Sequence, residues 1–230
     1  DCVDRDGLDG SYTICHYNPT GERRMINFAD RPCRINTYGD SFTQCIQVND
    51  GESWQEYLAA HFGEPIRNYG VGSMGFYQVY RRMLREERTS LSAPNIILNV
   101  FSDDHYRSIY SIRYLHFTVD VYRRQKDIPT EGLWDFGNPP WPHLRLDPDT
   151  GRFEEHDNPY PTPESLYQLA DEDHIYETYK DNPALQAHLA ELGVSDINTS
   201  VLQRMADALE VPADFSSAEA SASTGRALLQ

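Results

Sequence analysis

The sequence predicts an α/β protein with a parallel sheet. Short apolar segments of strand character alternate with segments whose apolar residues recur at helical spacing, and turn-forming residues follow each strand candidate. A strand–helix–strand–helix–strand series favours parallel strands joined by right-handed crossovers, with helices covering the faces of the sheet. We expect this unit to span residues 34–105.

The first strand candidate is residues 34–38, and it ends at the polar turn Gly39-Asp40-Ser41. A capping box, Ser53 to Glu56, then predicts a helix start. The helix is supported by apolar residues at helical spacing: Trp54, Tyr57, Leu58 and Phe62.

The second strand candidate is residues 66–69, followed by a glycine-rich turn at 70–75. A second amphipathic helix follows, with its apolar residues at Phe76, Val79, Tyr80, Met83 and Leu84. Residues 95–101 form the most apolar run in the chain. Such a run predicts a strand buried on both faces.

The pattern changes after residue 105. Residues 106–215 are expected to form an inserted cap of helices and one hairpin, whose turn is centred on residues 147–151. Residues 1–33 are rich in turn formers and predict an N-terminal arm without a clear element. Residues 216–230 predict the start of a truncated C-terminal segment. Since only three strand candidates are found, the fold is expected to be incomplete at the C-terminus.

The charge balance excludes two classes of partner. Asp and Glu total 36 against 20 Lys and Arg, a net charge of −16. Nucleic acids and anionic membranes both require a basic surface, so neither is expected as a partner. No apolar run approaches the ~18 residues of a membrane helix, so membrane insertion is not expected. The four cysteines show no zinc spacing; compartment and oligomeric state stay open.

Polar residues gather where the three strand candidates end, at residues 39–41, 70–75 and 102–105. Sites in parallel sheets lie at the carboxyl ends of the strands, so these segments are expected to converge. Ser41, at a strand-to-helix turn, is a candidate nucleophile, and Asp40 can brace the turn by accepting N–H bonds. The same two residue types also serve as ordinary helix caps.

Three blocks in this order resemble the GDSL/SGNH hydrolase family. They are Gly39-Asp40-Ser41-Phe42, Asn68 through Gly75, and Phe101-Ser102-Asp103-Asp104, and the resemblance covers roughly residues 34–110. It implies a flavodoxin-like, three-layer α/β/α fold. It also implies a serine esterase or acyltransferase that acts on a small acyl ester, including esters of carbohydrates, through an acyl-serine intermediate. The substrate is then a small molecule or carbohydrate ester, and no cofactor or metal is expected.

The resemblance also implies an oxyanion hole. Its donors would come from the backbone of Ser41 and of the second block, at Gly72, Ser73 and Gly75, and from the third block at Asp103. The family usually has Asn at this last position. An ionised Asp cannot donate a hydrogen bond, so three alternatives stay open: Asp103 is protonated, a backbone N–H replaces it, or the hole is arranged differently.

The general base has several candidates. The family supplies it from a D-x-x-H block near the C-terminus, and the one such spelling here is Asp171 to His174, in a stretch that also fits a solvated acidic helix. His105 follows the third strand candidate, and His16 lies upstream of the serine. A histidine outside this sequence is the remaining alternative.

Two other functions stay open. One is a non-catalytic binding module of SGNH-like fold, motivated by Asp103 and the uncertain base. The other is a metal-dependent hydrolase centred on Asp103 and His105, whose carboxylate and imidazole groups are potential metal ligands.

Overall fold

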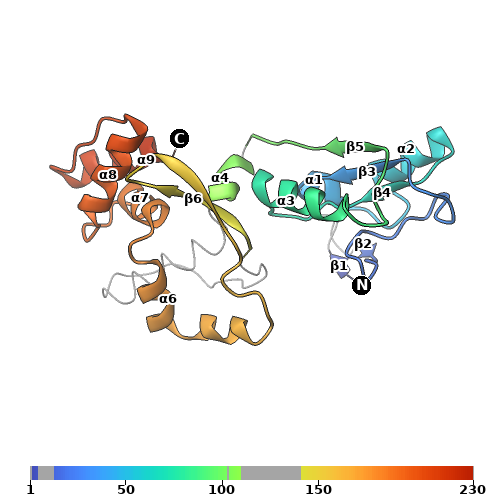
Figure 1. The fold of residues 1–230 in the computed structure, drawn as a ribbon, viewed down its shortest axis with the longest axis horizontal. Coiled ribbons are helices and arrows are strands. Elements are labelled where there is room, and N and C mark those ends of the chain that lie inside the picture. The colour runs from blue at the N-terminus through green and yellow to red at the C-terminus, as the bar shows by residue number, and fades with distance from the viewer. Residues whose placement is uncertain (1, 5–12, 103, 110–140, 230) are drawn as a thin grey trace. The chain divides into compact units, whose positions relative to one another are not determined.

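The computed structural model describes residues 2–4, 13–102, 104–109 and 141–229 (Figure 1). The chain divides into two compact units, Asp1–Arg107 and Ser108–Gln230. The first unit carries the strands and helices predicted for residues 34–105 together with the N-terminal arm. The second carries a hairpin and a group of helices.

The first unit is built on a three-stranded parallel sheet. Its strands are β3 (Ile35–Tyr38), β4 (Ile66–Asn68) and β5 (Asn95–Leu98), in the order β4-β3-β5. Ile35 is paired with Ile66 on one side and with Asn95 on the other. The chain is therefore an α/β protein with a small parallel sheet, as the alternating pattern predicts.

Four helices accompany this sheet in the described residues: α1 (Ser41–Gln44), α2 (Trp54–Phe62), α3 (Phe76–Glu86) and α4 (Asp104–Ile109). The predicted starts of α2 and α3 are confirmed, but the capping box is not formed. Ser53 makes no side-chain cap, and the Glu56 carboxylate instead accepts the backbone N–H groups of Ile26 and Asn27. The Glu56 carboxylate, which was expected to cap the start of α2, thus binds the N-terminal arm instead.

The N-terminal arm is more ordered than its turn-rich sequence predicts. Strands β1 (Cys2–Asp4) and β2 (Thr13–Cys15) pair antiparallel. Further along, the Arg23 N–H donates to the Asn68 carbonyl at 2.9 Å, so the arm lies along the β4 edge of the sheet. Periodicity could not reveal these pairings, because they are made by single residues and very short strands.

The prediction that residues 95–101 are buried on both faces is wrong. Ile96 is 44% exposed and Ile97 is 37% exposed. Successive side chains of a strand point to opposite faces, so both faces of β5 are open. The reason is its place at one edge of the sheet, where no strand among the described residues pairs with its far side.

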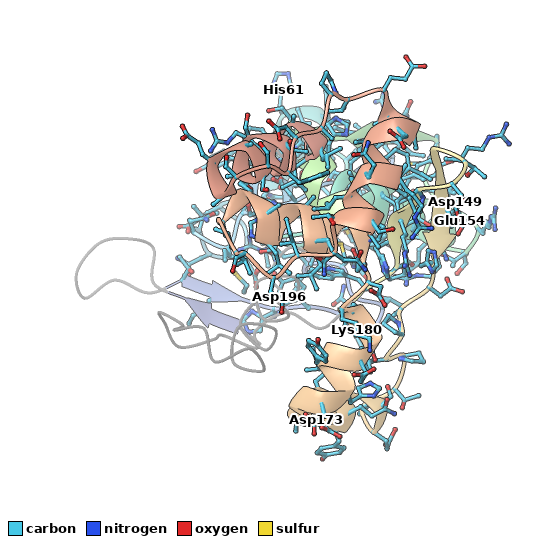
Figure 2. The ribbon with its side chains drawn as sticks, turned by 90° about the vertical axis from the view of Figure 1, so that its left-hand side faces the viewer. His61, Asp149, Glu154, Asp173, Lys180 and Asp196 are labelled. Atoms are coloured by element: carbon cyan, nitrogen blue, oxygen red, sulfur yellow. The ribbon has the colours of Figure 1, made fainter. Side chains whose placement is uncertain are left out.

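The second unit contains the predicted hairpin. Strands β6 (His143–Asp147) and β7 (Arg152–His156) pair antiparallel, and the Asp147 carboxylate accepts hydrogen bonds from the Asp149 N–H and the Thr150 hydroxyl in the turn. Asp149 and Glu154 project from this hairpin in Figure 2. Gly151 completes the turn at a φ of 67°, in the left-handed region that favours glycine.

The rest of the second unit is helical. It comprises the 3₁₀ helix η1 (Ser165–Ala170), α6 (Glu172–Tyr179), α7 (Pro183–Glu191), α8 (Thr199–Leu209) and α9 (Ala218–Leu228). The segment 216–224 carries little sequence signal, yet it lies largely within α9. Gly225 explains the packing, because a Cβ there would lie 2.5 Å from the Ala187 carbonyl oxygen of α7. No helix among the described residues is long and apolar enough to cross a membrane.

Candidate active site at the strand ends

Ser41 is the first residue of α1, and only Gly39 and Asp40 separate it from the end of β3. The turn that connects them is tight. A Cβ on Gly39 would lie 2.1 Å from the Thr43 hydroxyl oxygen and 2.9 Å from the Asn99 Cβ. Real Cβ atoms do not approach other atoms so closely, so glycine at position 39 is what allows the chain to enter the helix here.

Asp40 holds this turn in place. Its side chain is buried, and its Oδ1 accepts the Phe42 N–H at 3.0 Å and the Asn99 side-chain amide at 3.3 Å. The predicted bracing role of Asp40 is therefore confirmed. Its Oδ2 is also buried and has no hydrogen-bond partner among the described residues. A buried carboxylate with one unpaired oxygen is costly, so the bonds to Oδ1 matter for the stability of the turn.

The glycine-rich loop after β4 packs directly on the turn that carries Ser41. The Val71 N–H donates to the Gly39 carbonyl at 3.0 Å, and a Cβ on Gly70 would lie 2.2 Å from the Gln44 backbone nitrogen. A Cβ on Gly72 would lie 3.7 Å from the Ser41 Cβ. The structure thus brings the first two predicted segments together at one edge of the sheet.

The predicted oxyanion donors differ in their availability. The Gly72 N–H donates to Gln44 Oε1 at 2.7 Å, so it is already occupied. Ser73 has a φ of 68°, and Gly75 precedes α3 as its N-cap. The N–H groups of Ser41, Ser73 and Gly75 donate to no group among the described residues. Asp103 lies outside the described residues.

His105 lies on the segment that follows the third strand. Its ring is exposed and packs against Phe76, the first residue of α3, with 5.8 Å between ring centroids. Gln78 on α3 donates its side-chain amide to the carbonyl of Arg107, in the last turn of α4, at 3.1 Å, which ties α4 to α3. In the described part of the chain, no hydrogen bond joins Ser41 to a histidine.

His16 lies in the arm and pairs with a carboxylate. Its Nδ1 lies 2.5 Å from Asp50 Oδ2, and Asp50 Oδ1 accepts the Arg23 Nε–H at 3.0 Å. The Arg23 guanidinium also donates to the carbonyl oxygens of Gln44 and Cys45, at the end of α1. This network stabilises the C-terminal end of α1, whereas Ser41 is at the other end.

Asp171 and His174 belong to the second unit. Asp171 is the N-cap of α6, and its carboxylate accepts the N–H groups of Asp173 and His174. The His174 Nε2 lies 3.1 Å from the Tyr160 hydroxyl. The D-x-x-H pattern therefore coincides with a helix N-cap. Asp171 is the capping residue, and the His174 N–H that it accepts lies three positions later.

Two contributors to the site carry no motif, and sequence reasoning missed both. Asn99, directly after β5, donates to Asp40. Gln44 links three segments, because its Oε1 accepts from Gly72 while its Nε2 donates to the Tyr17 hydroxyl at 2.8 Å. A polar residue at the end of an apolar strand, as Asn99 is, was the one available signal.

Two stacked tyrosines lie beneath these strand ends, and the Arg82 guanidinium lies over one of them, 5.2 Å from the centroid of the Tyr69 ring. Tyr38 and Tyr69 stack with 5.0 Å between ring centroids, and both are buried. Burial raises the pKa of Tyr69 to about 12, so its phenol stays protonated at neutral pH. No group of three or more His, Cys, Asp or Glu side chains that could hold a metal ion occurs among the described residues. The alternative centred on Asp103 and His105 includes a residue outside that set.

The site contains a serine at a strand-to-helix turn, a buried carboxylate that braces it, and loop N–H groups at Ser73 and Gly75 that have no acceptor among the described residues. This arrangement can hold an oxyanion beside a hydroxyl nucleophile. Comparison of the chain with protein-family models, curated proteins and solved structures found no match.

Proposed function

We propose that this chain is a serine esterase or acyltransferase of SGNH type, with Ser41 as the nucleophile. The observation that carries the proposal is the packing of the Gly70–Gly75 loop on the Ser41 turn, which Gly70 and Gly72 permit. The strand order β4-β3-β5 places the second strand, the first and the third side by side. That order begins the flavodoxin-like series and supports the finer assignment of the fold.

The proposed reaction proceeds in two steps. The Ser41 Oγ attacks the carbonyl carbon of an ester while a general base takes the hydroxyl proton. The resulting oxyanion accepts hydrogen bonds from the N–H groups of Ser41 and of Ser73 or Gly75. The intermediate then expels the alcohol, which takes the proton from the base. In the second step water or a sugar hydroxyl gives its proton to the base and attacks the acyl-serine, and the base returns that proton to the Ser41 Oγ as the acyl group leaves.

For the general base, the proposal favours His105 over the other histidines of this chain. It follows the third strand, and its ring contacts Phe76, which directly follows the Gly70–Gly75 loop. His16 and His174 both have other partners, Asp50 and Tyr160. His105→Ala decides the point: if the rate of acylation is unchanged, the base comes from elsewhere.

The test is covalent labelling by a fluorophosphonate, together with turnover of p-nitrophenyl acetate. We expect the unaltered protein to be labelled at Ser41 and Ser41→Ala to lose both labelling and turnover. Ser90→Ala, at an exposed position, is the matched control and keeps both. Turnover that survives in Ser41→Ala would show that another group is the nucleophile. A protein that takes no label at all would instead be a non-catalytic binding module.

A further inference from the structure

Two large aromatic rings are exposed next to Ser41. Phe42 is 61% exposed and Phe101 is 37% exposed, and their ring centroids lie 5.3 Å apart with 58° between the ring planes. Val100, beside Phe101, is 51% exposed. Phe42 directly follows the proposed nucleophile, and Phe101 lies on the segment that leaves β5, so two strand ends contribute to this apolar surface.

The backbone of Phe42 is held by hydrogen bonds on both sides. The Phe42 N–H donates to Asp40 at 3.0 Å, and its carbonyl accepts the Trp54 indole N–H at 3.3 Å. Both backbone groups are therefore held by neighbours while the ring remains in solvent. An exposed apolar surface beside a reactive group is the usual mark of a ligand-binding site rather than of a solvated face.

The local charge supports an uncharged ligand. The chain carries a net charge of −16, yet no Asp, Glu, Lys or Arg occurs between Leu91 and Ser102. The segment that presents Val100 and Phe101 is therefore neutral in a strongly acidic protein. Up to Asp103 and Asp104, which follow it, this segment carries no charge that would need desolvation when an apolar group binds.

We propose that Phe42 and Phe101 bind the acyl group of the substrate, and that this group is an apolar chain of several carbons. The inference rests on the proposed function of Ser41. In that reaction the acyl carbon is bonded to the Ser41 Oγ from the first step until the second step breaks that bond, whereas the alcohol leaves in the first step. The acyl chain is therefore the part of the ester that remains within reach of the ring one residue away.

The same geometry disfavours a sugar as the group bound by these rings. Sugars stack on a flat aromatic face and are oriented by hydrogen bonds, and phenylalanine has no polar atom to supply one. The planes of Phe42 and Phe101 are tilted by 58°, so the two rings do not form one flat platform for a sugar ring, whereas a flexible chain can contact both. A sugar hydroxyl can still act as the acceptor in the second step.

The test compares two fluorophosphonate probes, one with an ethyl and one with a decyl group on phosphorus, at the same concentrations. We expect the unaltered protein to be labelled faster by the decyl probe, and Phe42→Ala to reduce this preference about tenfold, the factor that corresponds to about 1.4 kcal/mol. Phe101→Ala is a second variant with the same expected direction. Phe62→Ala is the control. Phe62 is 47% exposed and packs on Arg34, which precedes β3, whereas Ser41 and Phe42 follow β3.

The outcomes separate the two proposals. If both probes label Ser41 with the same preference in Phe42→Ala, Phe101→Ala and the unaltered protein, the acyl-binding role is wrong and Ser41 remains the nucleophile. If neither probe labels Ser41, the proposed function fails and this inference fails with it. Circular dichroism of each variant establishes that it is folded, and Phe42→Leu, which keeps an apolar side chain, should retain part of the preference.

Discussion

Asn99 donates its side-chain amide to the carboxylate of Asp40 at 3.3 Å, and thereby joins the end of β5 to the turn that carries Ser41. The Asn99 backbone N–H extends the ladder between the two strands by donating to the Tyr38 carbonyl at 2.8 Å. The position of Ser41 therefore depends on a residue that lies far along the chain and belongs to none of the three sequence blocks.

We expect Asn99→Ala to lower the free energy of unfolding by about 1.5–3 kcal/mol, the range for a hydrogen bond to a charged group. The reason is that Asp40 is buried and its Oδ2 already has no partner among the described residues. Urea denaturation measures the change. Asn95→Ala is the control, because the Asn95 amide makes an exposed hydrogen bond of the same length at the other end of β5. Equal losses in the two variants would contradict the bracing role.

Gly70→Ala should be far more damaging than Gly72→Ala. The added methyl group at position 70 would lie 2.2 Å from a backbone nitrogen of α1, which cannot move without displacing Ser41. At position 72 the nearest atom is the end of the flexible Gln44 side chain, at 2.9 Å. Overpacking of a rigid site costs about 1–3 kcal/mol or more. Thermal unfolding and fluorophosphonate labelling of the two variants check the order, and equal stability would show that the loop is not tightly packed.

The buried guanidinium of Arg23 should be essential for the N-terminal arm and α1. It donates to the carbonyl oxygens of Gln44, Cys45 and Val48, and pairs with Asp50. Arg23→Gln leaves the largely buried Asp50 carboxylate with only its His16 contacts and removes the three carbonyl contacts; losing one partner of such a pair typically costs about 3–5 kcal/mol.

Arg24→Gln is the matched control for this experiment, because Arg24 is the neighbouring residue and is exposed. It should change the free energy of unfolding by less than about 0.5 kcal/mol. Hydrogen exchange of the arm and of α1 shows where the structure opens. If Arg23→Gln is as stable as Arg24→Gln, the carbonyl contacts contribute nothing net.

The second unit should lose stability as the pH falls below about 6.5. Burial lowers the pKa of His143 below its ordinary value, and the neighbouring His156 ring, stacked at 5.5 Å between centroids, acts in the same direction. The unfolded chain then binds the proton more readily than the folded one. The stability is fully present above the unfolded pKa and falls as the pH passes down towards the folded pKa.

His143→Gln should flatten this pH dependence, and denaturation at several pH values between 5 and 8 measures it. The control is His61→Gln, since His61 is exposed on α2 in the first unit (Figure 2). A dependence on pH that persists unchanged in His143→Gln would assign it to other groups.

The sequence predicted the strands of the sheet, because two helices of clear periodicity, α2 and α3, separate them. It also located Ser41, Asp40 and the loop after β4, since glycines and polar residues mark strand ends. The failures have physical causes. Residues 95–101 are apolar, but apolar composition alone does not say whether a strand has neighbours on both sides. The Ser53–Glu56 pattern matched a capping box, yet the Glu56 carboxylate accepts two N–H groups from the arm instead.

What the sequence alone determined is the alternation of strands and helices and the residue types at each turn, because these depend on near neighbours in the chain. Only the tertiary structure decided which groups meet. In the tertiary structure the Gly72 N–H donates to Gln44 and the Asn99 amide donates to Asp40. Asp171 caps a helix in a different unit from Ser41. Contacts between residues distant in sequence depend on the packing of whole elements, and no local pattern records them.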